Sequence, residues 1–192
     1  MKKITLFILV TLVTTLFAFT VKQSSFWKLD NNHAKLGFTI THLLVSDVDG
    51  FFSKFDAKII SAKSDFSDAV VELTADASSI NTDNEKRDTH LKSADFFDVA
   101  KYPTLSFKST SFTSTGDGKY LVKGNLTMHG ITKPIVLNTI IRQGINPMTK
   151  GVVAGFKITG TIKRSDFNIG SYPPAILSNE VEINANAEFS KN

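Results

Sequence analysis

Eight runs of alternating apolar and polar residues lie between residues 36 and 189, and they constrain the fold more than any other feature of the chain. An alternation with a period of two puts every second side chain on the same face, which is typical of a β-strand with one buried face. Three clear runs are Tyr120 to Met128, Val152 to Lys163 and Val181 to Phe189. A tight turn at Gly116-Asp117-Gly118 precedes the first of these. The sequence therefore predicts an all-β domain.

The chain has five other runs of this kind, and one polar segment lies among them. Their apolar residues on one face are Leu36, Phe38 and Ile40; Phe51, Phe55, Ala57 and Ile59, after a turn at Asp49-Gly50; Ala69, Val71, Leu73, Ala75 and Ala77; Leu105 and Phe107; and Ile135 to Ile141, which Pro134 opens. A proline is tolerated at the start of a strand. Residues 84–94 are polar and rich in helix formers, which predicts one short helix with Asp83 as its N-cap and Leu91 as its apolar contact.

Strands joined in chain order by short turns predict an eight-stranded antiparallel up-and-down barrel, with the helix between strands 3 and 4. A two-sheet sandwich is the alternative, but its close-packed core needs large side chains. The predicted inward face instead carries many small residues: Ala57, Ala69, Ala75, Ala77, Gly124, Ala154, Gly160, Ala185 and Ala187. Mixed with phenylalanines, these residues predict a tapered apolar cavity. The alternative is that large residues of the opposite wall fill each gap.

The N-terminus has the pattern of a secretory signal peptide. Lys2 and Lys3 precede a run without charge from Ile4 to Val21. We expect residues 1–21 to be a signal peptide, with an uncleaved anchor as the alternative, and residues 26–190 to form a single domain. In both cases the domain faces an extracytoplasmic compartment. A domain without cysteine fits the bacterial envelope, in the periplasm or as a secreted protein.

Composition excludes several kinds of site. The chain has no cysteine, which removes disulfides, thiolate metal sites and Cys nucleophiles, and its formal net charge of +4 gives no support for nucleic-acid binding. The four histidines, His33, His42, His90 and His129, include no pair at the i,i+2 or i,i+4 spacing of metal ligands. Sixteen phenylalanines stand against one Trp and three Tyr. The sequence predicts a large apolar lining, with no metal, no cofactor and no catalytic centre.

Several stretches resemble the YceI-like protein family. The two most specific are Arg87 to Asp98, continued by Lys101-Tyr102-Pro103-Thr104 and Phe107, and Gly124 to Pro134. Residues 33–42, 50–52 and 164–170 fit the same pattern, so the resemblance extends in order over nearly all of residues 27–190. This chain has Asn168 where the family usually has a glycine soon after the phenylalanine.

The resemblance implies an extended lipocalin-like barrel, exported in bacteria, that holds a polyisoprenoid chain in its lumen, and it implies no established catalysis. The expected ligand is an apolar isoprenoid lipid or an isoprenoid quinone, which the protein binds, transports or stores. Strand parity and the family motifs select the expected lining: Phe38, Ile40, His42, Phe55, Leu73, Phe107, Leu126, Ala154, Phe156, Ile158, Phe167 and Ile183. His42 is expected at the inner mouth, as a polar contact for a head group or as a hydrogen-bonded strand end.

Two other functions stay open on sequence grounds. A lipid-modifying enzyme would use His42 or His90 as a base, together with an acid and an oxyanion donor that residue spacing does not reveal. A ligand-free envelope stress or interaction protein would have a filled barrel. The partners predicted are the lipid itself and a membrane surface where it is loaded, with no nucleic acid, and a homodimer is left open.

Overall fold

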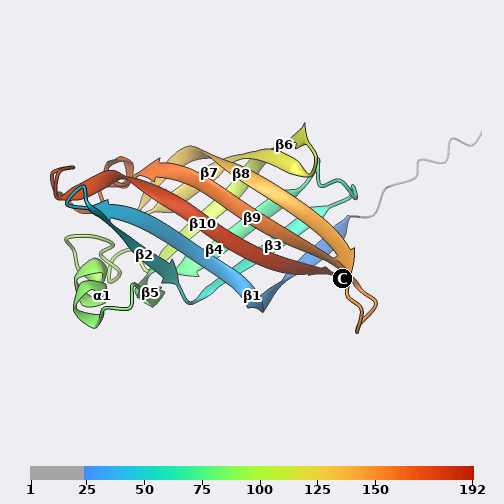
Figure 1. The fold of residues 1–192 in the computed structure, drawn as a ribbon, viewed down its shortest axis with the longest axis horizontal. Helices are drawn as coiled ribbons and strands as arrows, with labels where there is room; N and C mark the ends of the chain where they lie inside the picture. The colour runs from blue at the N-terminus through green and yellow to red at the C-terminus, as the bar shows by residue number, and fades with distance from the viewer. Residues whose placement is uncertain (1–23) are drawn as a thin grey trace, which may run out of the picture.

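The structure is a computed structural model that describes residues 24–192, and its body is an elongated closed barrel (Figure 1). The strands are β1 (Ser25–His42), β2 (Ser46–Phe52), β3 (Phe55–Ser61), β4 (Val70–Asp76), β5 (Ile80–Asn81), β6 (Thr104–Gly116), β7 (Lys119–Met128), β8 (Ile131–Ile145), β9 (Val152–Lys163) and β10 (Leu177–Lys191). The helices are α1 (Glu85–Lys92) and two short 3-10 turns, η1 (Ala77–Ser79) and η2 (Arg164–Phe167).

The barrel closes because β10, the last strand, pairs with β1, the first. Between them, β3, β4, β6, β7, β8 and β9 follow one another, each antiparallel to the next. The long β1 pairs with β3 near its start and with β2 near its end, so β2 and β3 together take one place in the wall. The wall is therefore eight strands around, which confirms the predicted up-and-down barrel and excludes the sandwich.

The second strand differs from the prediction. Asp49 and Gly50 do not form a turn but pair with β1, where Gly50 lies against the Phe38 ring, and a Cβ at Gly50 would come within 2.3 Å of that ring. The chain turns earlier, at residues 43–45. The predicted long strand also breaks at residues 53–54, which shifts the parity, so Phe52 lines the interior in place of Phe51. Phe51 instead lies beneath Lys35, whose Nζ is 5.3 Å from the ring centroid.

The predicted helix is present as α1, but its cap is one residue later than predicted. Asn84 is the N-cap, and its side-chain oxygen accepts a hydrogen bond of 3.0 Å from the backbone N–H of Arg87. Asp83 stands before the cap, with a φ of 57°. Leu91 packs against the core, as expected.

Pro134 does not open its strand, because β8 begins at Ile131. Pro134 pairs with Asn125 of β7, whereas the pairing of β8 with β9 starts only at Asn138. At Pro134 the strand thus has a neighbour on one side alone, and the missing N–H costs no bond to β9.

One end of the barrel is closed by Phe66, which is fully buried. Its ring lies 4.9 Å from that of Trp27 and 5.4 Å from that of Phe156, between centroids. The loop that carries Phe66, residues 62–69, is fastened across the end of the barrel. The Tyr120 hydroxyl and the Gln143 amide donate to its backbone carbonyl groups, at 2.6 and 2.8 Å. An aromatic core therefore seals this end.

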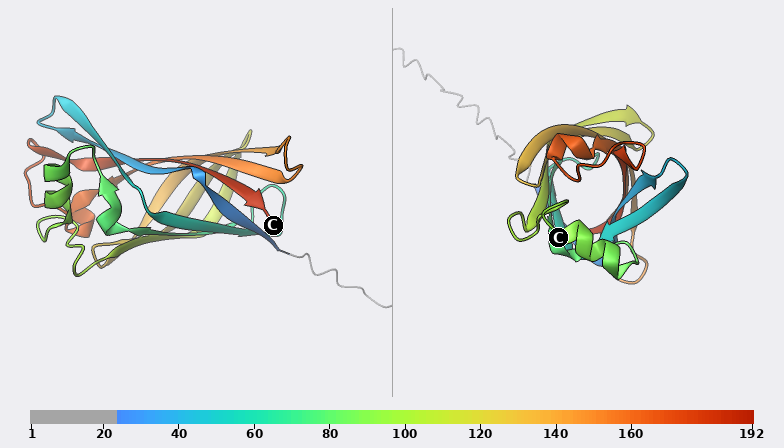
Figure 2. Two further views of the ribbon diagram at one scale, coloured as in Figure 1. Left: turned by 90° about the horizontal axis from the view of Figure 1, so that it is seen from below. Right: turned by 90° about the vertical axis from the view of Figure 1, so that its left-hand side faces the viewer.

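At the opposite end lie α1 and the loop between β9 and β10 (Figure 2). This loop begins with η2, and Asn168 ends η2 in the left-handed conformation, with φ 54° and ψ 35°. Asn is one of the few residues besides Gly that visit this conformation routinely. The chain therefore makes this turn with an asparagine and needs no glycine at position 168.

Within residues 24–192, none of the helices is both long and apolar enough to cross a lipid bilayer. The predicted signal peptide, residues 1–21, lies outside the described residues. The start of β1 and the end of β10 lie together at the closed end of the barrel, because Trp27 pairs with Lys191.

Candidate ligand-binding site

An apolar cavity of about 450 Å³ lies inside the barrel. All strands except the two-residue β5 contribute side chains to its wall. Cavities that bury small ligands range over about 300–1,000 Å³, so this one has the volume of a binding site. Aliphatic and aromatic groups make up most of the lining, and the polar groups gather mainly at one end.

All the lining residues predicted from the sequence contribute to the wall, apart from Ala154 and Phe167. They are Phe38, Ile40, His42, Phe55, Leu73, Phe107, Leu126, Phe156, Ile158 and Ile183. Strand parity brings them together: inward residues pair with inward residues of the next strand, as Phe38 does with Ile183 and Phe107 with Leu126. The predicted lining residues that the structure places in the wall all lie on strands, where alternation predicts the inward face.

Ala154 and Phe167 do not line the cavity, contrary to the prediction. Ala154 is fully buried and pairs with Phe189 near the sealed end, so its neighbours already occupy the space in front of it. Phe167 is buried in η2, and its backbone carbonyl accepts a 3.0 Å hydrogen bond from His129 Nδ1. Because η2 is a turn, period-two parity says nothing about the direction of Phe167.

Fewer small residues open the cavity than the sequence predicts. A Cβ at Gly124 would lie 2.3 Å from the Phe107 ring, and one at Gly160 would lie 2.6 Å from Leu137. Side chains of neighbouring strands thus fill these two gaps. Ala69, Ala75, Ala77 and Ala154 are buried outside the cavity, whereas Ala57, Ala185 and Ala187 line it. Large side chains therefore fill some of the gaps beside small residues, and other gaps remain open as part of the cavity.

Polar side chains line the cavity at the end covered by α1, which we call the mouth. They include His42, at the end of β1, and Arg87 and His90, both on α1. Thr82 holds the Arg87 guanidinium through hydrogen bonds of 2.7 Å to its hydroxyl and its carbonyl oxygen. His90 Nε2 pairs with an Asp95 carboxylate oxygen at 3.1 Å. A ligand with a polar end would therefore find hydrogen-bonding groups at the mouth and almost none deeper in the cavity.

Arg164 is a second guanidinium at the mouth, and it is buried, with 5% of its surface exposed. It donates hydrogen bonds to the backbone carbonyl groups of Ser178, Ile169, Gly170, Tyr172 and Leu177. Burial lowers its pKa from the usual value, but an arginine stays charged in proteins. Within residues 24–192 it has no carboxylate partner. Its role is to fix the loop that frames the mouth.

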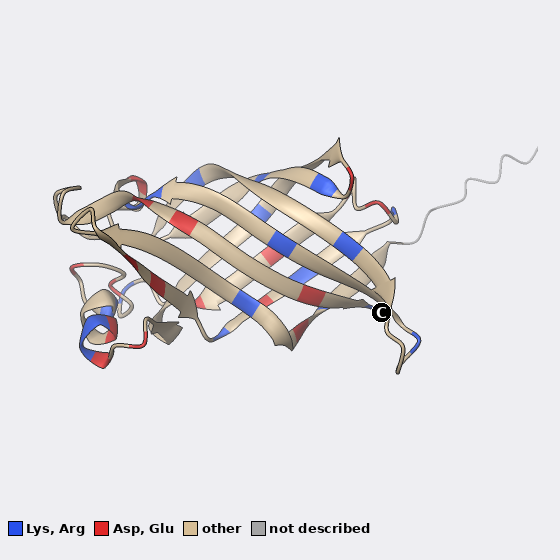
Figure 3. Cartoon of the chain, in the orientation of Figure 1, with Lys and Arg blue, Asp and Glu red and all other residues tan. Residues whose placement is uncertain are grey.

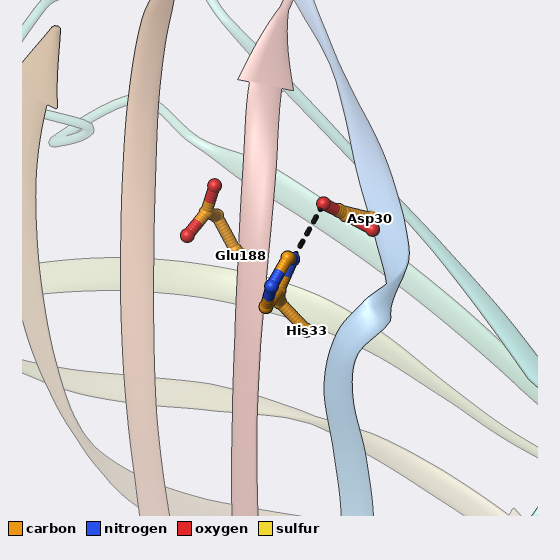
Figure 4. Close-up of side chains that lie close together, drawn as sticks. All are labelled: Asp30, His33 and Glu188. Atoms are coloured by element: carbon orange, nitrogen blue, oxygen red, sulfur yellow. Dashed lines mark hydrogen bonds and ion pairs between the residues drawn. The ribbon is translucent and has the colours of Figure 1, made fainter. Parts of the chain in front are cut away.

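A cluster of ligand-type side chains lies elsewhere, on the outside of the barrel (Figure 4). The ligand atoms of Asp30, His33 and Glu188 lie within 4.8 Å of one another. Asp30 pairs directly with Glu188, and the β-bulge after Asp30 brings His33 beside them. His33 Nδ1 bonds to Asp30 Oδ2 at 2.8 Å, which raises the pKa of His33 and lowers that of Asp30. The spacings between histidines in the sequence could not reveal this group, because the group contains only one histidine. Glu188, moreover, lies far from Asp30 and His33 in the sequence.

Comparison with known proteins gives consistent relatives. Residues 27–189 match the YceI-like domain. Protein YceI of Salmonella newport is 38% identical over 177 residues, which cover 90% of this chain and 91% of that protein.

Solved structures agree with this match. The Campylobacter jejuni YCEI protein superposes with a TM-score of 0.72 at 31% identity, covering 79% of this chain and 90% of that chain. A polyisoprenoid binding domain from Saccharophagus degradans, described as implicated in plant cell wall breakdown, has a TM-score of 0.62 at 16% identity, covering 86% and 98%. This second likeness is one of fold. By sequence and by fold, the chain belongs to the YceI-like domain family.

Proposed function

We propose that this protein binds a long apolar isoprenoid lipid, a polyisoprenoid or an isoprenoid quinone, in the lumen of its barrel. The cavity carries the proposal, because its walls are largely apolar, Phe66 seals one end, and its polar side chains lie mainly near the mouth. Binding of a polyisoprenoid is the property named for the Saccharophagus degradans domain, whose fold this chain shares.

The shape of the barrel suits an extended chain. β10 has 15 residues, and at ~3.3 Å per residue it extends over about 50 Å. Burial of a methylene contributes about 0.8 kcal/mol, so a five-carbon isoprene unit contributes about 4 kcal/mol before the cost of ordering the chain. Two or three such units inside the wall are sufficient for tight binding.

The lining assigns roles along the ligand. Phe38, Phe55, Phe107 and Phe156 present rings to the cavity and are proposed to contact the apolar chain. His42 lies at the mouth and is proposed to contact the polar end. The protein thus orients the lipid with its head group outward, which is the arrangement needed for loading and release in transport or storage.

Binding is favoured over catalysis. Acid–base chemistry on a lipid needs a titratable pair beside the reacting atom, shielded from water. The titratable pair at the mouth is His90 and Asp95, near the end of α1. Their side chains are 47% and 71% exposed, so water reaches both. We therefore propose no catalytic role for His42 or His90.

Titration of delipidated protein with solanesol, a long polyprenol, tests the proposed function. Saturable binding of about one molecule per chain is expected, with much weaker binding of palmitic acid, because the shorter chain buries fewer methylenes. Absence of saturable solanesol binding would overturn the proposal.

We propose in addition that the protein is exported to the bacterial envelope, in the periplasm or beyond. The support is the charged start at Lys2 and Lys3 and the uncharged run to Val21. The intact mass of the protein from an envelope fraction should correspond to the loss of about 18 to 25 residues. A full-length cytosolic product would contradict export.

A further inference from the structure

We propose that the hairpin tip Leu43-Leu44-Val45 docks the protein on a neutral phospholipid bilayer, and that the lipid ligand enters the mouth across this tip. The inference rests on the proposed function and names the surface that delivers the ligand. The three side chains form the turn between β1 and β2 and are 51%, 68% and 82% exposed. Exposure of three consecutive apolar side chains to water is unfavourable, and exposed apolar patches often mark surfaces that contact a membrane or another molecule.

The backbone conformation of the turn does not explain why Leu43 and Leu44 are leucines. Leu43 and Leu44 have φ angles of 52° and 60°, and the Val45 N–H donates to the His42 carbonyl at 3.2 Å. A hairpin turn whose two central residues both have positive φ strongly prefers Asn-Gly, and each leucine is unfavourable there. The chain therefore keeps apolar side chains at a position where folding alone would favour polar or small ones.

An apolar surface leads from the tip into the cavity. The Leu43 N–H donates to the carbonyl of Ile176 at 2.9 Å, which fastens the tip to the loop before β10. Ile176 and Tyr172 of that loop are 42% and 38% exposed, and both also line the cavity. Figure 2 shows the hairpin, this loop and α1 together at one end of the barrel. A lipid tail that leaves a bilayer at the tip can thus reach the lumen along apolar groups.

The opposite end provides a natural comparison. The β8–β9 hairpin there carries Ile145 and Met148, which are 69% and 86% exposed. Neither residue lines the cavity, and Phe66 separates that end from it. Exposure alone therefore does not distinguish the two ends, whereas continuity with the cavity favours the Leu43-Leu44-Val45 tip.

Charge near the tip favours a neutral bilayer over an anionic one. Between residues 36 and 52 the chain has Asp47 and Asp49 and no Lys or Arg. On β10, Glu182 pairs with Thr39 of β1, whereas Glu180 lies opposite Lys163 of β9. Figure 3 shows acidic residues and no basic ones along β2. These carboxylates oppose an approach to anionic lipids, so docking relies on insertion of the apolar side chains and is insensitive to salt.

Uptake of solanesol from phosphatidylcholine vesicles by the delipidated full chain is the test. The variant Leu43→Asn with Leu44→Gly should lower the initial uptake rate by at least about tenfold, because the inserting side chains are gone. Its thermal stability should be unchanged or higher, since the turn is now relaxed. The matched variant Met148→Ser should take up solanesol at the wild-type rate.

A second arm delivers solanesol from ethanol, without vesicles. The tip variant should then bind it as tightly as the wild type. Wild-type uptake should be equal at low and high salt and should not increase when phosphatidylglycerol is added to the vesicles. Equal vesicle uptake by the tip variant and the wild type, or uptake that requires anionic lipid, would overturn the docking proposal and leave the proposed function intact. Failure of the wild type to bind from either source would overturn both.

Discussion

At the scale of single residues, Ala185 tests whether the cavity is reserved for a ligand. Ala185 lies on β10 and lines the cavity, in register with Leu36 of β1 and Ile158 of β9. Ala185→Trp should place an indole in the lumen and expel the lipid with little loss of stability, because the ring takes space that the ligand would occupy. Co-purified lipid and the denaturation midpoint are the two quantities to measure.

Two variants provide the controls for Ala185→Trp. Asn186→Trp, the next residue on the strand, points outward and should retain the lipid. Ala154→Trp enters the filled part of the core and should lower the free energy of unfolding by about 1–3 kcal/mol through overpacking. If Ala185→Trp kept its lipid, or unfolded as readily as Ala154→Trp, the cavity would not be the binding site.

Arg164 gives a second prediction at this scale, for the frame of the mouth. Its guanidinium bonds to backbone carbonyl groups on both sides of the β9–β10 loop. Arg164→Lys keeps the charge but offers fewer donors, and each buried carbonyl left unpaired should cost about 1–3 kcal/mol. Denaturant unfolding should show this loss, whereas the exposed neighbour Lys163→Ala should be close to wild type. If Arg164→Lys were as stable as the wild type, the carbonyl groups would not need the several N–H donors of the guanidinium.

At the scale of elements, parity holds only while a strand is unbroken, and this limited the prediction from sequence. The interior was predicted correctly along β7, where Tyr120 to Met128 alternate without interruption. It was inverted at Phe51 and Phe52, because the break at residues 53–54 is set by pairing with β1 and not by any local signal.

Turns carry the parts of the site that the sequence did not reveal. Phe66 seals the barrel from a loop without alternation, and Arg164 binds carbonyl groups that are 5 to 14 residues away. Both roles depend on contacts between residues that no periodic pattern relates. The family resemblance included residues 164–170 but gave Arg164 no role, and its hydrogen-bond partners are known only from the fold.

On the outer face of β3, β4 and β6, one glutamate forms ion pairs with two lysines, and their contribution to stability depends on pH. Glu72 on β4 bonds to Lys108 at 2.8 Å and to Lys58 at 2.7 Å, each directly opposite it on the next strand. These hydrogen bonds and charges lower the pKa of Glu72 from 4.5 to about 2. A lowered folded-state pKa contributes stability that is present above pH 4.5 and is lost as the pH falls through about 2.

Glu72→Gln should therefore flatten the acid limb of the stability curve. The gap in unfolding free energy between wild type and variant should be widest above pH 4.5, narrow as the pH falls towards 2, and shrink with added salt. Chemical denaturation across this pH range checks it. A gap that is constant with pH would show that the Glu72 carboxylate adds nothing through its charge.

At the scale of the whole molecule, the barrel has one end sealed by an aromatic core and one end with a polar mouth. Phe66, Trp27 and Phe156 pack the sealed end, where both the first strand and the last meet. The mouth combines α1, the Arg164 loop and the apolar hairpin tip. Such a division suits a carrier that takes up and releases one ligand from one side. The homodimer stays a prediction.

Mass spectrometry of an organic extract from protein purified without detergent tests the central claim most directly. We expect about one isoprenoid lipid per chain in the wild type and a strongly reduced amount in Ala185→Trp, because the proposed site is a single cavity in each barrel and Ala185 lines it. Wild-type protein that yields no isoprenoid lipid and does not acquire one from solanesol would contradict the account.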